Sequence, residues 1–166
     1  GSGAMGGVVN LLTPQVEFSA QREQGGRFGV AASSVDKGFS GALTVQALVR
    51  AYAERIAAFD QGGPRINSVL ALNPNAPADA RLADAWLAAQ PVGALAPLFG
   101  IPVLIKDNIE CAGMEATAGS VCLRGNLAVA DAFVVRRLRE AGAIVLAKTN
   151  LHELASGGET VSSILG

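Results

Sequence analysis

The pattern of apolar and polar positions predicts a series of helices and short strands from about residue 44 onward. Apolar residues first recur at the three- and four-residue spacing of an amphipathic helix. Thr44 is placed to cap the start of this helix, and the helix is expected to end at Gly62-Gly63-Pro64. Residues 66–72 then suit a strand, and an alanine-rich helix follows residues 74–77. The apolar positions are Val45, Leu48, Val49, Tyr52 and Ile56 in the first helix and Leu82, Trp86 and Leu87 in the second.

The second half of the chain contains two continuous apolar runs, at 101–105 and 143–147. Runs of this length without alternation are typical of strands that are buried on both faces. Asp131 is placed to cap a helix between them, and Gly142 suits the left-handed residue that closes such a helix. Two strands joined through a helix form a parallel pair, so the sequence predicts an α/β fold.

The N-terminal residues 1–38 show little periodicity and contain several glycines, which predicts a flexible arm. The first residues, Gly-Ser-Gly-Ala-Met, resemble a cloning scar rather than a signal peptide, because they lack both a basic start and an apolar centre. We therefore expect the folded part of the chain in residues 39–166.

The composition excludes several classes of function. The chain has 166 residues, of which 50% are apolar and 16% charged, and its net charge of -1 gives no reason to expect nucleic acid or a membrane surface as partner. No run of about eighteen apolar residues occurs, so no membrane span is expected. Two cysteines and one histidine are too few for the usual metal sites, so no metal is expected. A soluble, cytoplasmic protein is predicted.

Lysine is rare in this chain, and two of its three lysines follow predicted strands. Lys106 ends the first apolar run and Lys148 the second, and the working site of an open α/β sheet lies beyond the carboxyl ends of its strands. Two interpretations stay open: a solvated side chain where a strand reaches the surface, or an amine drawn into a dry site. In a dry site, lost hydration favours the neutral amine, which can act as a base.

Several segments of the second half resemble the opening part of the amidase signature family. The similarity covers about residues 40–166 with order and spacing kept, and the segment around Lys106 is its most specific part. The family includes relatives of the A subunit of glutamyl-tRNA amidotransferase. The matching segments are Phe-Gly-Ile-Pro-Val-Leu-Ile-Lys-Asp-Asn-Ile at 99–109, Ala-Gly-Ser at 118–120, Asp-Ala at 131–132 and Ala-Gly-Ala-Ile-Val-Leu-Ala-Lys-Thr-Asn-Leu-His-Glu at 141–153.

The resemblance implies an amide hydrolase with a serine, cis-serine, lysine triad on a mixed sheet flanked by helices. Lys106 matches the family's catalytic lysine, which takes a proton through the bridging serine while the second serine attacks the carbonyl of a small amide substrate. Lys148 matches a lysine that is not the base, so a structural role with bonds to loop carbonyls is expected there. No metal or cofactor is implied.

The chain departs from the family pattern because both serines belong to glycine-rich motifs several tens of residues beyond its end. We expect the remainder of the domain or a second chain to supply them, and we expect this chain alone to be inactive. Ser162 and Ser163 lack flanking glycines and are not expected to be nucleophiles. For substrate binding the resemblance points to Ser156, Gly157 and Gly158, with a glycine-rich surface turn as the alternative.

Two classes of function stay open at this point. The first is a segment of an amide hydrolase that converts a carboxamide into a carboxylic acid and ammonia or an amine. Release of ammonia to water and its transfer to an acceptor are not distinguished. The second class is a catalytically inactive truncated fragment or a protein-binding module, which docks through uncovered sheet edges.

Several other polar residues have structural interpretations. His152 is expected in solvent or bonded to the backbone, because it has no serine or cysteine partner at a recognisable spacing. Cys111 and Cys122 are expected as free, buried thiols. The remaining assignments are turn chemistry for Ser120 and local hydrogen bonds for Asp107 and Asn108, which would orient the lysine loop.

Overall fold

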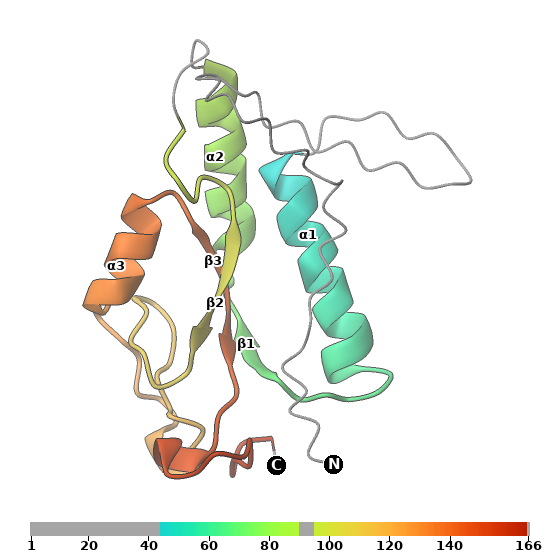
Figure 1. Cartoon of the computed structure of the whole chain (residues 1–166), viewed down its shortest axis with the longest axis vertical. Helices are drawn as coiled ribbons and strands as arrows, with labels where there is room; N and C mark the ends of the chain where they lie inside the picture. Colours follow the sequence, from blue (N-terminus) through green and yellow to red (C-terminus); the bar gives the residue numbers. More distant parts are fainter. Residues whose placement is uncertain (1–43, 90–94, 166) are drawn as a thin grey trace, which may run out of the picture. The chain divides into compact units, whose positions relative to one another are not determined.

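The computed structural model describes residues 44–89 and 95–165, so the arm predicted at 1–38 lies outside the described residues. A three-stranded sheet forms the centre, in the order β1(Val69–Leu72), β3(Ile144–Thr149), β2(Pro102–Lys106) (Figure 1). β1 pairs with β3 in antiparallel orientation, and β2 pairs with β3 in parallel. The predicted α/β fold with a mixed sheet is therefore confirmed.

Helices flank both faces of this sheet. They are α1(Val45–Arg55), α2(Ala76–Ala89) and α3(Phe133–Glu140), with the short helical turns η1(Ile56–Gln61), η2(Val121–Leu123) and η3(Glu153–Ala155). None of the helices in the two described ranges is long and apolar enough to cross a membrane.

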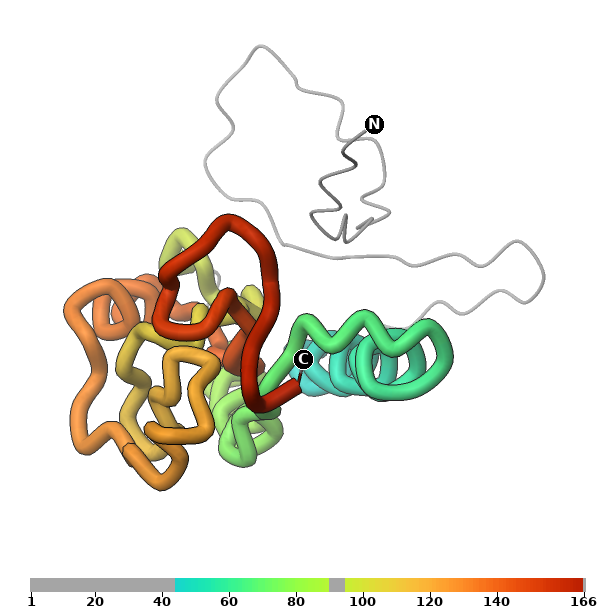
Figure 2. Tube along the Cα trace, turned by 90° about the horizontal axis from the view of Figure 1, so that it is seen from below, coloured from blue at the N-terminus to red at the C-terminus, as the bar shows by residue number. Residues whose placement is uncertain are grey.

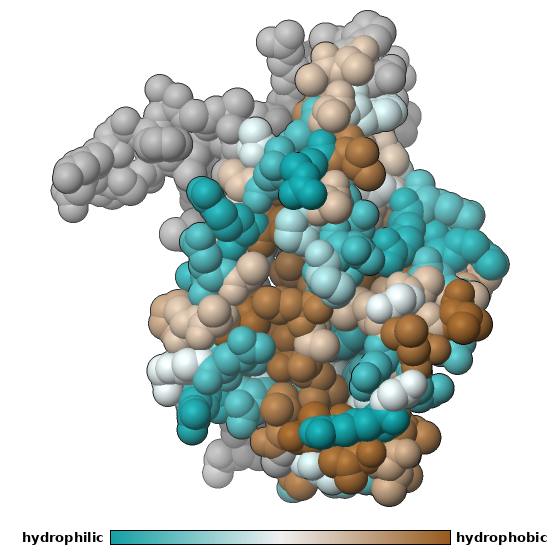
Figure 3. Space-filling model, turned by 180° about the vertical axis from the view of Figure 1, so that it is seen from behind, coloured by the Kyte–Doolittle hydropathy of each residue, from teal (hydrophilic) through white to brown (hydrophobic). Residues whose placement is uncertain are grey.

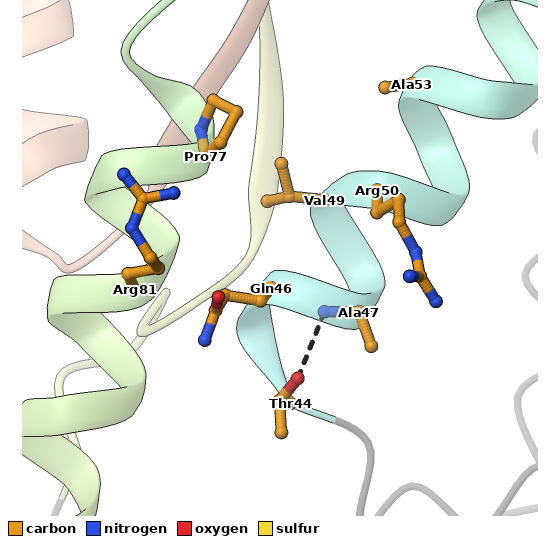
Figure 4. Close-up of a pocket in the computed structure, with 8 residues that line it drawn as sticks. All are labelled: Thr44, Gln46, Ala47, Val49, Arg50, Ala53, Pro77 and Arg81. Atoms are coloured by element: carbon orange, nitrogen blue, oxygen red, sulfur yellow. Dashed lines mark hydrogen bonds between the residues drawn. The ribbon is translucent and has the colours of Figure 1, made fainter.

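The cap predicted for the first helix is present. The backbone N–H of Ala47 donates to Thr44 Oγ1 at 3.0 Å (Figure 4). Asp84 of α2 accepts from the Val45 N–H at 2.7 Å, so the two helices are joined at this end, and a groove of 490 Å³ lies between them (Figure 4). Further along, α1 widens into the π-helical turn η1 and ends at Gly62, as predicted.

The second helix packs through its smallest residues rather than its largest. Ala76 and Ala80 are fully buried in a cluster with residues of α1 and β3. Leu82, Trp86 and Leu87, the large apolar residues of this helix, are between 44% and 70% exposed. Alanine side chains let the helix approach its neighbours closely, and this close packing leaves the larger side chains outside the core.

Two apolar clusters lie on opposite faces of the central strand. The cluster on the side of α1 and α2 joins Val49, Val69, Ala76, Ala80, Ile144, Leu146 and Ala147. The cluster on the side of α3 joins Ile105, Cys111, Met114, Val135 and Val145. β3 is therefore buried on both faces, as its continuous apolar sequence predicts.

A β-bulge decides which side chains of β3 face each cluster. Val103 lies opposite Val145, but the next residue of β2, Leu104, lies opposite Ala147, so Leu146 is an extra residue in β3. Beyond the bulge, Ile105 pairs with Lys148 and Lys106 pairs with Thr149. Paired residues share a face and consecutive residues alternate, so Lys148 projects to the α3 side and Lys106 to the opposite side.

The strand β2 lies at the edge of the described sheet, which corrects the prediction that both apolar strands are buried on both faces. Leu104 is 46% exposed, and Ile101, directly before the strand, is 39% exposed. α1 and α2 pack against β1 and β3. Within residues 44–89 and 95–165, the corresponding side of β2 therefore stays open.

The role predicted for Asp131 is also wrong. α3 follows Ala132 without a side-chain cap, and the Asp131 carboxylate instead accepts from the Ala112 N–H at 2.8 Å and lies 3.0 Å from Arg139 Nε. Asp131 thus ties the loop before the helix to its last turn. The closing glycine is as predicted, because Gly142 has a φ of +90°.

Replacing Gly142 by alanine should lower the stability of the fold. A Cβ at this position would lie 2.8 Å from the Phe99 Cα, so steric crowding of about 1–3 kcal/mol adds to the strain of the left-handed backbone. Gly113→Ala is the matched control: its φ is +80° but no atom lies within 4 Å, so only a strain of about 1–2 kcal/mol applies. Denaturant unfolding measures the free energy of unfolding of both variants. Equal losses in Gly142→Ala and Gly113→Ala would contradict the close packing of Gly142 against Phe99.

Candidate active site

The loops that follow β2 and β3 meet at one end of the sheet. Figure 2 views the molecule from this end, and the segment after β3, in dark red, lies beside the loop after β2, in yellow and orange. Hydrogen bonds join them, among them one from the Leu154 N–H to the Ala118 carbonyl at 2.8 Å and one from the Val121 N–H to Ser163 Oγ at 3.0 Å. Both strand-end lysines, Lys106 and Lys148, lie at this end. It is the end beyond the carboxyl ends of the parallel strands, where the site of an α/β sheet is expected.

Lys148 is sealed inside this end of the sheet. The residue is 1% exposed, its Nζ lies 3.1 Å from Asp107 Oδ1, and it donates to the Glu115 carbonyl at 2.9 Å. The expected bond to a loop carbonyl is therefore present. Because its amine is engaged by a carboxylate and a carbonyl, Lys148 holds the loop after β2 against β3.

The partner Asp107 does more than the local role predicted for it. Its carboxylate is buried and accepts from the Thr117 N–H at 3.0 Å, from the Thr117 hydroxyl and, at 3.4 Å, from the Gly119 N–H. The groups that contact the Asp107 carboxylate come from two segments of the chain: Lys148 from β3, and Thr117 and Gly119 from the loop after β2. The sequence shows that Asp107 follows a strand-end lysine, but only the register of the sheet reveals that its partner is the other lysine.

Lys106 is presented differently, although it precedes Asp107 directly. It is exposed, it projects from the open side of β2 next to Leu104, and it takes part in none of the ion pairs within the described residues. Its backbone is fixed, because the Lys106 carbonyl accepts from the Ile109 N–H at 2.9 Å. The two lysines that look alike in sequence thus differ completely in their surroundings.

The crossing of the two loops is tight and strained. Ala118, Leu154 and Ala155 all have positive φ angles of 50–56°, which are uncommon for residues with a side chain. A Cβ at Gly119 would lie 3.0 Å from the Leu151 carbonyl oxygen, so a larger residue would push the loops apart. Strained backbone of this kind often marks functional sites, where the surrounding structure maintains it.

Glu153 joins the same two loops, a role that no pattern in the sequence indicates. Its carboxylate accepts from the Ser120 hydroxyl at 2.7 Å and from the Ser163 N–H at 3.0 Å. The hydrogen bonds from Ser120 and Ser163 favour the ionised form and lower the pKa of Glu153. Ser120 also accepts from the Cys122 N–H at 3.4 Å, which is the turn chemistry predicted for it.

The candidate substrate-binding residues Ser156, Gly157 and Gly158 lie in the exposed segment directly after η3. The Ser156 hydroxyl donates to the Glu153 carbonyl at 2.8 Å. A Cβ at Gly157 would lie 2.7 Å from the His152 ring, whereas Gly158 has open space around it. His152 Nδ1 lies 2.9 Å from the Glu159 carbonyl oxygen, so this histidine has the backbone partner expected for it.

The remaining polar residues of the loops have partners or positions that the structure settles. Cys111 is a buried free thiol as predicted, but Cys122 is exposed, because it lies on the surface turn η2. Ser162 Oγ accepts from the Leu165 N–H at 3.1 Å. Ser163 Oγ accepts from the Val121 N–H, so the hydroxyl oxygens of both Ser162 and Ser163 accept hydrogen bonds from backbone N–H groups.

Removing the charge of Glu153 should change how stability depends on pH. A lowered pKa in the folded state stabilises the fold above the ordinary value of 4.5, and this contribution disappears as the pH falls through the folded-state pKa. Glu153→Gln should therefore lose stability at neutral pH and show a weaker further loss in acid. Unfolding curves across this range test it, with the exposed Glu159→Gln as control; parallel pH dependence in wild type and Glu153→Gln would contradict it.

Comparison with known proteins assigns the chain to a family. Residues 47–166 match the family model Amidase. The chain is 38% identical over 125 residues to the A subunit of the glutamyl-tRNA(Gln) amidotransferase of Acidothermus cellulolyticus, and the match covers 75% of this chain and 24% of that protein. It is 40% identical over 114 residues to a probable amidase of Arabidopsis thaliana, and this match covers 68% of this chain and 22% of that protein.

The solved structures include the native peptide amidase from Stenotrophomonas maltophilia. The match has a TM-score of 0.68 and 45% identity, and it covers 76% of this chain and 26% of that enzyme. The chain thus spans about a quarter of the length of the relatives it matches. On the family model and the shared fold, this chain belongs to the amidase family.

Proposed function

We propose that this chain provides the lysine base of an enzyme that hydrolyses a carboxamide to a carboxylic acid and ammonia or an amine, and that the base is Lys106. One observation carries the proposal: the sheet presents Lys106 on its open side, whereas Lys148 is engaged inside with Asp107 and Glu115. A base must release and regain a proton during each turnover, which requires an amine that reaches the reacting groups.

The proposed reaction follows the chemistry of a serine, serine, lysine triad. Neutral Lys106 takes a proton from the bridging serine, which in turn takes the proton of the nucleophilic serine as that oxygen attacks the amide carbonyl. Backbone N–H groups stabilise the oxyanion, and the proton returns to the departing amine. Water then attacks the acyl-serine ester by the same proton path and releases the carboxylic acid.

The surroundings of Lys106 suit this role once its side of the sheet is covered. The neighbouring residue on that face is Leu104, and the ion pairs of the described part place no carboxylate on Lys106. Covering such a face removes water from the amine, and lost hydration favours its neutral form. The same covering would bury the exposed side of β2.

The serines are proposed to come from the remainder of the amidase domain or from a second chain. Seen from behind, apolar side chains form a broad patch across the middle and lower part of the surface (Figure 3). Exposed apolar surface of this kind is typical of a face that another part of a protein covers. Apart from that view, several large apolar residues on and near β2, η2 and α3 are exposed: Ile101, Leu104, Leu127, Val129, Phe133 and Val134.

The substrate is proposed to contact the loop of Ser156, Gly157 and Gly158. This loop follows η3 at the same end of the sheet as Lys106, and it lacks bulky side chains at two positions. The names of the relatives indicate both hydrolysis, in the peptide amidase, and amide transfer, in the amidotransferase. Of these two reactions we propose hydrolysis by the completed enzyme, with no activity from this chain alone.

Replacing Lys106 should strongly slow hydrolysis of an aryl amide by the enzyme assembled with its serine-bearing part. Lys106→Ala removes the base, and loss of a general base lowers kcat by about 10²–10⁴-fold. Lys106→Arg should lower kcat by a similar factor, because a guanidinium keeps its proton at any pH of interest.

Lys37→Ala is the matched control, because Lys37 lies outside the described residues and outside the family match. Its kcat should equal that of the wild type. Hydrolysis at an undiminished rate by Lys106→Ala would remove this residue from the mechanism.

A further inference from the structure

We propose that Asp107 is a positioning residue that fixes where Lys106 presents its amine. The inference rests on the proposed function for the role of Lys106, but its structural part concerns only contacts within the described residues. Asp107 follows Lys106 directly, so any restraint on Asp107 acts on the peptide that carries the candidate base. The side chain of Asp107 itself points to the other face of the sheet, toward Lys148.

The Asp107 carboxylate is held from two directions. Oδ1 lies 3.1 Å from Lys148 Nζ on β3, and Oδ2 accepts from the loop after β2, through both donors of Thr117 and the Gly119 N–H. Asp107 and Lys148 are both buried, so water does not weaken these bonds. Four contacts from separate segments leave this carboxylate a single orientation.

The backbone of Asp107 is held as well. Its N–H donates to the Thr149 carbonyl at 3.1 Å, which extends the pairing of β2 with β3 by one residue. Its carbonyl accepts from the Ala118 N–H at 3.3 Å. With side chain and backbone both restrained, the direction in which the Lys106 side chain leaves the sheet is fixed, and only its flexible stem remains to be ordered.

A fixed departure direction matters because proton transfer depends strongly on distance. A misplacement of about 1 Å in a catalytic group costs about 10²-fold in rate. Asp107 therefore acts through Lys106 and touches no reacting atom. Its buried partner Lys148 supplies the counter-charge that lets an ionised carboxylate occupy this position.

The structural half of the proposal is tested on the 166-residue chain by hydrogen exchange. Asp107→Asn keeps the shape of the side chain but removes its charge, and the amides of Asp107 and Ile109 should then exchange about tenfold to a hundredfold faster, as expected when charge-assisted hydrogen bonds are lost. The matched control is Asp131→Asn, which removes another carboxylate paired with a cation and a loop N–H. Exchange at Asp107 and Ile109 should be unchanged in this control.

The functional half is tested by steady-state kinetics of the assembled enzyme on an aryl amide. A positioning role predicts that Asp107→Asn lowers kcat by about 10²-fold while KM stays within about twofold, because only the transition state needs the placed amine. Asp131→Asn should keep the wild-type kcat. If Asp107→Asn only reduced the fraction of folded protein, activity would also fall, but the faster exchange would not be confined to residues 107–109. The exchange data therefore distinguish a local effect on Lys106 from a general loss of folding.

The double variant Asp107→Asn/Lys148→Met separates positioning from charge compensation. If Asp107 served only to neutralise Lys148, removing both charges would restore kcat, and that result would overturn the proposal. Should Asp107→Asn fail to fold, Thr117→Val gives the same test, because it removes one donor to Asp107 and keeps the side-chain volume. Faster exchange and a lower kcat are expected there too.

Two failures are told apart by including Lys106→Ala in the same series. If Lys106→Ala is inactive and Asp107→Asn retains wild-type kcat, the positioning role is wrong and the proposed function stands. If Lys106→Ala retains full activity, the proposed function is wrong and the positioning role is overturned with it.

Discussion

The buried ion pair between Asp107 and Lys148 is the interaction on which this end of the fold depends. Ions are costly to remove from water, and a buried pair is tolerated only where hydrogen bonds satisfy its remaining atoms. Here Thr117, Gly119 and the Glu115 carbonyl provide those bonds. Removing one partner would leave the other charged and uncompensated, which would lower the free energy of unfolding by about 3–5 kcal/mol. The pair therefore joins β2, β3 and the loop between β2 and α3 into one unit.

The geometry of this pair follows from a single extra residue in the central strand. Without the bulge at Leu146, strict alternation would turn Lys148 toward α1 and α2, away from Asp107. With it, Lys148 faces the loop after β2, and Lys106 emerges on the other side. The arrangement gives two lysines at neighbouring strand ends different tasks: one stabilises the loops, and the other is available for chemistry.

The class of fold and the places of its main elements could be predicted, because they depend on local signals such as the Thr44 cap, the apolar run of β3 and Gly142. The exposure of β2 could not, because a continuous apolar run does not reveal whether both faces of a strand are covered; here α1 and α2 pack on β1 and β3 and leave Leu104 exposed. The cap predicted at Asp131 is wrong because its side chain bonds to Ala112 and Arg139 rather than to the first amides of the helix. Within the site, the positions of Lys106 and Lys148 were predictable, but the pairing of Asp107 with Lys148 depends on a bulge that no residue type announces.

The contrast between the two lysines is tested most directly by chemical labelling. The folded chain is treated with a limiting amount of an amine-acetylating reagent, and the modification of Lys106 and Lys148 is measured by peptide mass spectrometry, with the urea-unfolded chain as reference. We expect Lys106 to react in the folded chain nearly as it does in the unfolded chain, whereas Lys148 should react only after unfolding. Equal protection of both lysines, or rapid acetylation of Lys148 in the folded chain, would contradict the roles assigned to them.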